Sequence, residues 1–320
     1  MSLAEIKIVT EVYNKAVKEY KWQKELECLA SLKLLYCRDG DRVKDTRRIV
    51  AKWKLALEKY MKLYRSKLTP QQLCTYSEDL KNCYKYESEY LFESFLFYME
   101  WNRPNKERFY HPRQKQLKPC VDAMQDLADG KLKILAISMP ARVGKSTLGL
   151  WFGLWMGARN HKQSILMSGH STALMKTFYS ELLSLLTDEK YNYRYIFPDA
   201  QLVDTDALGG GLDLGEPKRY KTFALKSIDQ RISGQVEAST LLYVDDLISG
   251  TEEASKPERL DNALAKYLGD IKQRRTDNVP LLMIGTRWSL NDPIGVEERE
   301  HADDPMAKFI VMPALDDEGQ

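Results

Sequence analysis

The first hundred residues carry apolar side chains at the spacing of an α-helix. Apolar residues recur there every three or four positions, at Leu26, Leu29, Leu32, Leu35 and Tyr36. Residues 1–101 also contain a single proline and a single glycine and are rich in Leu, Lys, Glu and Tyr. This segment is therefore predicted to be all-helical, with the apolar stripe as core packing or a docking face.

Two breaks divide this segment into three predicted helices. The first is the turn at residues 37–41, where Asp41 or Asp45 is a candidate cap for the next helix. At the second break, Thr69 is placed to cap a helix whose first position is Pro70.

The pattern changes after residues 102–105, which predicts a second domain spanning 102–320. Short apolar runs now alternate with helical stretches, and they read as buried strands at 133–139, 164–168, 220–225, 241–244, 281–285 and 309–312. This alternation predicts an α/β fold with a mainly parallel sheet that helices cover on both faces. The glycine-rich residues 208–215 are predicted to form a surface loop.

Composition narrows the class of protein. The 320 residues are 43% hydrophobic and 29% charged, which suits a globular protein. The longest apolar stretches, 134–141 and 148–158, are shorter than the roughly 20 residues that cross a bilayer. No signal-peptide pattern opens the chain. The five cysteines form no CxxC pair and are expected to be reduced and mostly buried, as in a soluble cytoplasmic protein.

Charge is unevenly distributed, although the net charge is only +2. Residues 1–67 hold 17 lysines and arginines against 9 acidic residues. This excess fits either a solvated helical face or a surface for nucleic acid or an acidic partner, so it does not by itself decide the function.

A phosphate-loop motif lies between a predicted strand and a predicted helix. It reads Met139-Pro140-Ala141-Arg142-Val143-Gly144-Lys145-Ser146-Thr147. In such a motif, backbone N–H groups surround the β-phosphate of a nucleotide, Lys145 supplies positive charge and the Ser146 hydroxyl binds Mg²⁺. Met139 stands where the usual pattern has its first glycine.

A second motif follows about a hundred residues later. The apolar run at 241–244 ends in Asp245 and Asp246, as expected of a Walker B element. Asp245 is predicted to hold Mg²⁺ through water, and Asp246 to orient or deprotonate the attacking water. Glu252 and Glu253 are rival catalytic acids, and an ordinary strand followed by an Asp-rich turn is the alternative interpretation.

Two further segments complete the predicted site. The strand at 281–285 leads into Thr286, which would sense the γ-phosphate if this strand neighbours the phosphate loop. Upstream, residues 109–114 offer aromatic faces and the amide of Gln114, which can match the N6/N7 edge of adenine. A domain-entry turn with a solvent-facing glutamine is the alternative for this segment.

Together these motifs resemble the ATPase domain of large terminase subunits, the DNA-packaging motors of tailed bacteriophages and prophages. The resemblance covers residues 105–315 and rests on 110–114, MPARVGKST, YVDD and GTRWSLNDP. It implies an ASCE-type P-loop NTPase fold, ATP and Mg²⁺ as cofactors, and viral genome packaging. It implies the adenine motif at Gln114, Walker A at Arg142, Lys145 and Ser146, Walker B at Asp245 and Asp246, and coupling at Thr286.

The resemblance also implies partners. Such motors act as homo-oligomeric rings on double-stranded DNA, with a portal protein and a small terminase subunit, in the cytoplasm of the bacterial host. A neighbouring subunit commonly supplies an arginine to the site. Arg231 is the candidate for this role; Arg142 supplying the charge in cis and Arg231 as a surface residue are the alternatives. An isolated monomer is expected to hydrolyse ATP slowly.

Other functions remain open from the sequence. Large terminases usually continue into an RNase H-like nuclease, but these 320 residues show no carboxylate cluster for two-metal cleavage, so nuclease activity is not expected of them. A helicase-like DNA-dependent ATPase would need a second recA-like domain. A partner-docking module in which ATP is structural is the non-enzymatic alternative.

Overall fold

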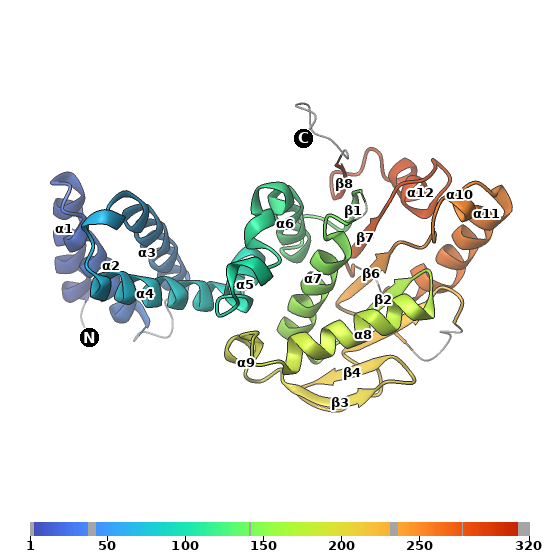
Figure 1. Ribbon diagram of the computed structural model, residues 1–320, viewed down its shortest axis with the longest axis horizontal. Coiled ribbons are helices and arrows are strands. Elements are labelled where there is room, and N and C mark those ends of the chain that lie inside the picture. Colours follow the sequence, from blue (N-terminus) through green and yellow to red (C-terminus); the bar gives the residue numbers. More distant parts are fainter. Residues whose placement is uncertain (1–2, 38–42, 141, 231–235, 277, 313–320) are drawn as a thin grey trace. The chain divides into compact units, whose positions relative to one another are not determined.

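The computed structural model describes residues 3–37, 43–140, 142–230, 236–276 and 278–312 (Figure 1). The chain divides into two units, Met1–Trp101 and Asn102–Gln320. The change of sequence pattern after residue 101 lies at this division.

The N-terminal unit is helical, but its described residues form five α-helices where three were predicted. They are α1 (Leu3–Lys18), α2 (Trp22–Cys37), α3 (Val43–Leu63), α4 (Pro70–Ser88) and α5 (Phe92–Met99). No glycine or proline marks the break between α1 and α2. Tyr20 adopts the left-handed φ of 55° there. The α4–α5 break occurs where Leu91 is extended, with φ −115°.

Local signals at the helix ends are partly as predicted. Thr69 caps α4: its hydroxyl accepts a hydrogen bond from Gln72 N, Oε1 of Gln72 accepts one from Thr69 N, and Pro70 follows. Asp45 is not a cap, because α3 begins at Val43 and includes Asp45 in its first turn. Asp41 lies outside the described residues.

The apolar stripe of α2 packs into the core of the N-terminal unit. Leu26 and Leu29 join a buried cluster with Val50, Trp53 and Leu57 of α3. Leu32 and Tyr36 are buried as well, with Ile49. The stripe therefore serves as core packing, the first of its two predicted roles.

The C-terminal unit is built on an eight-stranded sheet within the described residues. Its strands are β1 (Ile134–Ser138), β2 (Ile165–Gly169), β3 (Leu202–Asp206), β4 (Gly211–Leu214), β5 (Phe223–Ser227), β6 (Leu241–Asp245), β7 (Leu281–Gly285) and β8 (Ala307–Val311). Its helices are α6 (Gln114–Ala128), α7 (Lys145–Arg159), α8 (Thr172–Thr187), α9 (Tyr193–Ile196), α10 (Thr251–Ala254), α11 (Pro257–Lys266) and α12 (Pro293–Glu300).

The sheet has the strand order β3-β4-β5-β2-β6-β7-β1-β8, and the strands from β5 to β8 are parallel. This confirms the predicted α/β class and mainly parallel sheet. β7 lies between β1 and β6, so that Gly285 pairs with Ser138 on one side and Ile284 with Asp245 on the other. The carboxyl ends of these three strands consequently meet at one edge.

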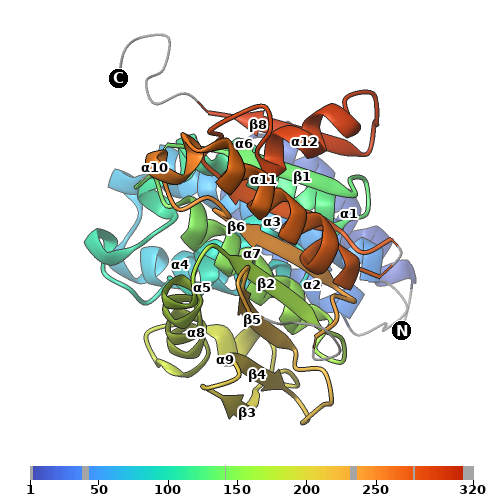
Figure 2. The same cartoon turned by 90° about the vertical axis from the view of Figure 1, so that its right-hand side faces the viewer.

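The two faces of the sheet are covered by different helices. On β6, Leu242 and Val244 pack in a buried cluster with Leu260 and Ala263 of α11. Tyr243 points to the other face, where it lies against α7. Figure 2 shows α11 crossing the near face of the sheet, with α7 behind it.

Close packing of α7 on the sheet depends on glycines that recur every four residues, at Gly149, Gly153 and Gly157. A Cβ atom at Gly149 would lie 2.3 Å from Tyr243 Oη on β6, and one at Gly157 would lie 2.5 Å from Phe223 Cε1 on β5. Such distances are too short for any carbon–carbon or carbon–oxygen contact. The glycines thus let the helix approach large aromatic side chains, which fixes where its first residue, Lys145, lies.

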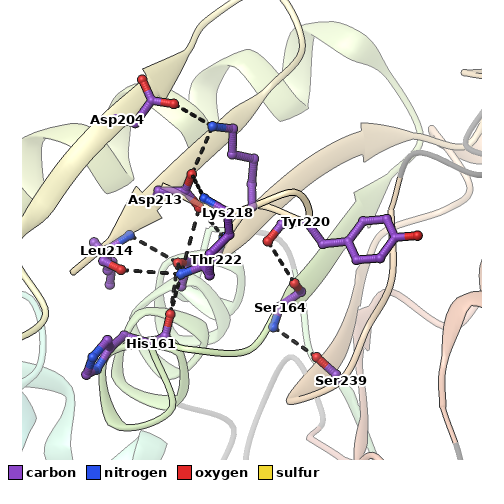
Figure 3. A network of polar contacts seen from close by, with 10 residues as sticks. His161, Ser164, Asp204, Asp213, Leu214, Lys218, Tyr220, Thr222 and Ser239 are labelled. Carbon is purple, nitrogen blue, oxygen red and sulfur yellow. Dashed lines mark hydrogen bonds and ion pairs between the residues drawn. The ribbon is translucent and has the colours of Figure 1, made fainter. Parts of the chain in front are cut away.

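The prediction of a surface loop at 208–215 is wrong for its second half. Residues Gly211–Leu214 form β4, which is fully buried and pairs antiparallel with β3 and β5. Leu212 and Leu214 enter the core, whereas Asp213 is buried in a polar network (Figure 3). Asp213 accepts hydrogen bonds from Lys221 Nζ at 2.8 Å and from Thr222 N at 3.0 Å, which compensates its burial.

Candidate functional site

The phosphate-loop motif leads directly from β1 into α7. Before Lys145, the first residue of the helix, Arg142 and Gly144 have φ values of 68° and 92°. These left-handed residues turn the chain sharply, and α7 then presents amide groups that have no carbonyl partner within the helix. The positive end of the helix dipole and these amides form a place for an anion such as phosphate.

Gly144 is required for space as well as for conformation. A Cβ atom at this position would lie 2.5 Å from Phe109 Cε2. Phe109 belongs to the aromatic segment upstream of α6, so this glycine lets that segment lie against the loop.

The three central strands bring Lys145, Asp246 and Thr286 into one hydrogen-bonded group. Lys145 Nζ lies 2.9 Å from Asp246 Oδ2 and donates to Thr286 Oγ1 at 2.8 Å. Thr286 N donates to Asp246 Oδ1 at 2.8 Å. The lysine side chain is only 8% exposed, so this contact is far less screened by solvent than a surface ion pair.

Thr286 is held in place by the segment that follows it. Asp292, which is buried, accepts hydrogen bonds at Oδ2 from Trp288 N at 2.8 Å and Ser289 N at 3.0 Å. Its Oδ1 accepts from Gly295 N at 2.8 Å, which caps α12. The string GTRWSLNDP therefore forms a turn after Thr286 that hydrogen bonds to Asp292 close.

Asp245 is a carboxylate buried at the end of β6. It is 1% exposed, and neither of its carboxylate oxygens accepts a well-formed hydrogen bond from the described residues. Burial, and then the charge of Asp246, raise the pKa of Asp245 to about 7, which the nearby hydroxyl groups of Ser146 and Tyr243 partly oppose. A buried carboxylate of this kind can serve as a ligand for a cation.

A pocket of about 740 Å³ lies beside the phosphate loop. The Phe109 and Trp151 rings in its wall are 5.9 Å apart, and Tyr191 meets Trp151 edge-on at 5.7 Å. The volume and the aromatic walls suit a small organic ligand. The wall is made of Arg103, Asn105, Lys106, Glu107, Arg108, Phe109, Pro112, Arg113, Thr147, Trp151, Glu181, Ser184, Leu185 and Tyr191.

This pocket meets the predicted adenine segment only in part. Phe109, Pro112 and Arg113 line it, but Gln114, the first residue of α6, is not among its lining residues. Sequence reasoning missed Trp151 and Tyr191. Trp151 lies two residues after Gly149, on the helix face opposite the glycines. That position could have indicated a contact away from the sheet.

The remaining predicted residues are not part of the Lys145 group. Glu253 accepts hydrogen bonds from Ser249 N at 2.7 Å, and Glu252 pairs with Lys256 Nζ at 2.9 Å, so the described contacts of both rival acids are local. Arg142 is exposed. Ala141 and Arg231 lie outside the described residues.

One group on α12 has the donor atoms for a metal ion among the described residues, namely Glu297, Glu300 and His301. Glu297 already accepts a hydrogen bond from Tyr267 Oη at 2.9 Å and lies 2.5 Å from Lys272 Nζ. Lys272 Nζ also lies 3.6 Å from Glu300 Oε2. The ammonium group supplies the positive charge there, so we interpret the group as a structural ion-pair network.

No protein-family model matches the chain, and no curated protein matches it in sequence. None of the described helices is long and apolar enough to cross a membrane.

The raised pKa of Asp245 predicts a pH-dependent stability. Between its ordinary pKa of 3.8 and about 7 the folded protein holds a proton that the unfolded chain has lost, so the stability falls as the pH rises. We expect the unfolding free energy of the wild type, relative to Asp245→Asn, to fall by up to about 4 kcal/mol across this window. Urea unfolding in the presence of a chelator measures it.

The same substitution at the exposed Asp303 is the matched control. If the difference in unfolding free energy between wild type and Asp245→Asn stays constant over this pH range, the raised pKa of Asp245 is contradicted.

Proposed function

We propose that the C-terminal unit is a P-loop nucleoside triphosphatase of the ASCE type. The observation that carries this proposal is the position of β7 between β1 and β6, together with the Lys145–Asp246–Thr286 group at their carboxyl ends. Parallel α/β sheets bind their ligands at that edge. The left-handed turn before α7 supports the same conclusion.

Within that class, we propose the ATPase motor domain of a large terminase subunit, which moves double-stranded viral DNA into a procapsid. This narrower proposal rests on the combined motifs MPARVGKST, YVDD and GTRWSLNDP. The geometry gives the last motif a physical role, because the buried Asp292 holds the turn that carries Thr286.

Phosphate binding engages the start of α7. The amides of the first helical turn and Lys145 receive the β- and γ-phosphates. The ammonium group of Lys145 lies 2.9 Å from Asp246 Oδ2. The phosphates therefore compete with Asp246 for the lysine, and nucleotide binding frees Asp246 Oδ2.

Asp245 and Ser146 fit a hard divalent cation such as Mg²⁺, because a buried carboxylate that accepts no well-formed hydrogen bond from the described residues lies near a hydroxyl group. When bound, Mg²⁺ would neutralise charge on the phosphates. Tyr243, buried beneath this site, keeps water from that side of Asp245.

Asp246 orients the attacking water and accepts its proton. Thr286 N keeps Oδ1 in place at 2.8 Å, which leaves Oδ2 for the water once Lys145 has moved to the phosphates. Thr286 Oγ1 loses its lysine partner in the same step, so its turn responds to the nucleotide state.

The pocket beside the loop receives the adenosine part of ATP. Thr147 belongs both to the loop motif and to the pocket wall, so the two sites are continuous. The purine would stack on the aromatic side chains, with Arg113 supplying polar contacts.

We keep Arg231, and Arg142 as its alternative, as the candidates for an arginine that stabilises the transferring phosphoryl group. DNA, a portal protein and a small terminase subunit are the proposed partners of a ring of such chains.

Two substitutions separate binding from hydrolysis. We expect Lys145→Ala and Asp246→Asn each to lower the rate of ATP hydrolysis by at least about 100-fold. Affinity for a nonhydrolysable ATP analogue should fall in Lys145→Ala, because this change removes a phosphate ligand. It should rise in Asp246→Asn, because this change removes the competitor for Lys145. Steady-state kinetics and calorimetric titration measure the two effects.

The exposed residues Lys256 and Asp303, replaced by alanine and asparagine respectively, are the matched controls. Wild-type hydrolysis in both site variants would overturn the proposed enzyme.

The motor proposal also predicts DNA binding dominated by phosphate contacts. We expect the full chain to bind two unrelated DNA duplexes with similar affinity, and this affinity to fall tenfold or more between about 50 and about 200 mM salt. Fluorescence anisotropy measures both quantities. A strong preference for one sequence, or no binding at low salt, would argue against translocation along DNA.

A further inference from the structure

Asp246 has a backbone conformation that few residues with a side chain adopt. Its φ is 39°, in the left-handed region. Such a conformation persists only where the surroundings hold it. The contacts that hold Asp246 therefore decide where its carboxylate lies.

Four contacts restrain this residue. Asp246 N donates to Ile284 O at 2.8 Å, Thr286 N donates to Oδ1, and Lys145 binds Oδ2. The fourth comes from the segment that follows β2, where His170 Nδ1 lies 2.9 Å from Asp246 O. The carbonyl oxygen can only accept a hydrogen bond, so His170 Nδ1 carries the proton.

The His170 contact gains importance when nucleotide binds. In the proposed mechanism Lys145 leaves Asp246 for the phosphates, and the restraint on Oδ2 disappears at the moment when the carboxylate must orient water. The contacts to Ile284, Thr286 and His170 remain. Of these three contacts, only the one from His170 restrains the carbonyl group of Asp246.

The backbone around His170 is well placed to act as a support. The preceding residue, Gly169, ends β2 and accepts a hydrogen bond at its carbonyl from Ile228 N at 2.9 Å. The following residue, Ser171, caps α8 by accepting from Leu174 N at 3.2 Å. His170 is thus fixed between a strand end and a helix cap.

We propose that His170 is a positioning residue that holds the Asp246 backbone, and through it the Asp246 carboxylate, in the orientation needed for hydrolysis. This inference rests on the proposed ATPase function. It assigns no contact between His170 and the nucleotide, so removal of its hydrogen bond affects turnover and leaves nucleotide binding nearly unchanged.

The test compares His170→Leu with His170→Asn in the full chain. Asparagine has a donor, Nδ2, at the same branch position as His Nδ1, whereas leucine has none. We expect His170→Leu to lower kcat about tenfold while KM for ATP stays within about twofold. His170→Asn should recover kcat to within about threefold of wild type. His170→Ala serves as a second variant without the donor if the leucine variant does not fold.

Equal impairment of the asparagine variant and the donor-free variants, or wild-type kcat in a folded donor-free variant, would overturn the positioning role. These outcomes are distinct from failure of the proposed function, which would appear as wild-type hydrolysis in both Lys145→Ala and Asp246→Asn.

Discussion

The insertion of β7 between β1 and β6 is the constraint on which the candidate site depends. It sets Ser138 opposite Gly285 and Asp245 opposite Ile284, so three segments distant in sequence end at one level of the sheet. The helix that starts at Lys145 can then place its ammonium group against Asp246. The glycines of α7 keep that helix close enough to the sheet for the contact to form. A buried ion pair of this kind restrains both partners until another anion replaces one of them.

Much of the fold was predictable because local patterns agree with the tertiary structure. The six predicted strands are β1, β2, β5, β6, β7 and β8, with ends within three residues of the predicted runs. Apolar runs bounded by turns suffice for buried parallel strands. The cap at Thr69 was also predictable, since threonine followed by proline has a specific geometry at a helix start.

Other features depend on partners that the local sequence does not reveal. The strand β4 was not predicted because the run of glycines at 209–211 favours a loop. Its buried Asp213 needs Lys221, which lies eight residues later. The chain turns at Tyr20, just after α1, without glycine or proline. Packing of α2 on α1 and α3 overrides the preference of tyrosine for negative φ. The motifs of the candidate site were visible in the sequence. The lysine–aspartate pair, the aromatic pocket and His170 were not, since each joins residues from different elements.

In the proposed function, the Lys145–Asp246 pair marks a nucleotide site that exchanges one anion for another. The decisive measurement is a crystal structure of the chain with a nonhydrolysable ATP analogue and Mg²⁺. We expect Lys145 Nζ to leave Asp246 for the phosphates, the cation to lie at Ser146 and Asp245, and the base to enter the pocket beside Trp151. A nucleotide bound elsewhere, with the Lys145–Asp246 pair intact, would contradict it.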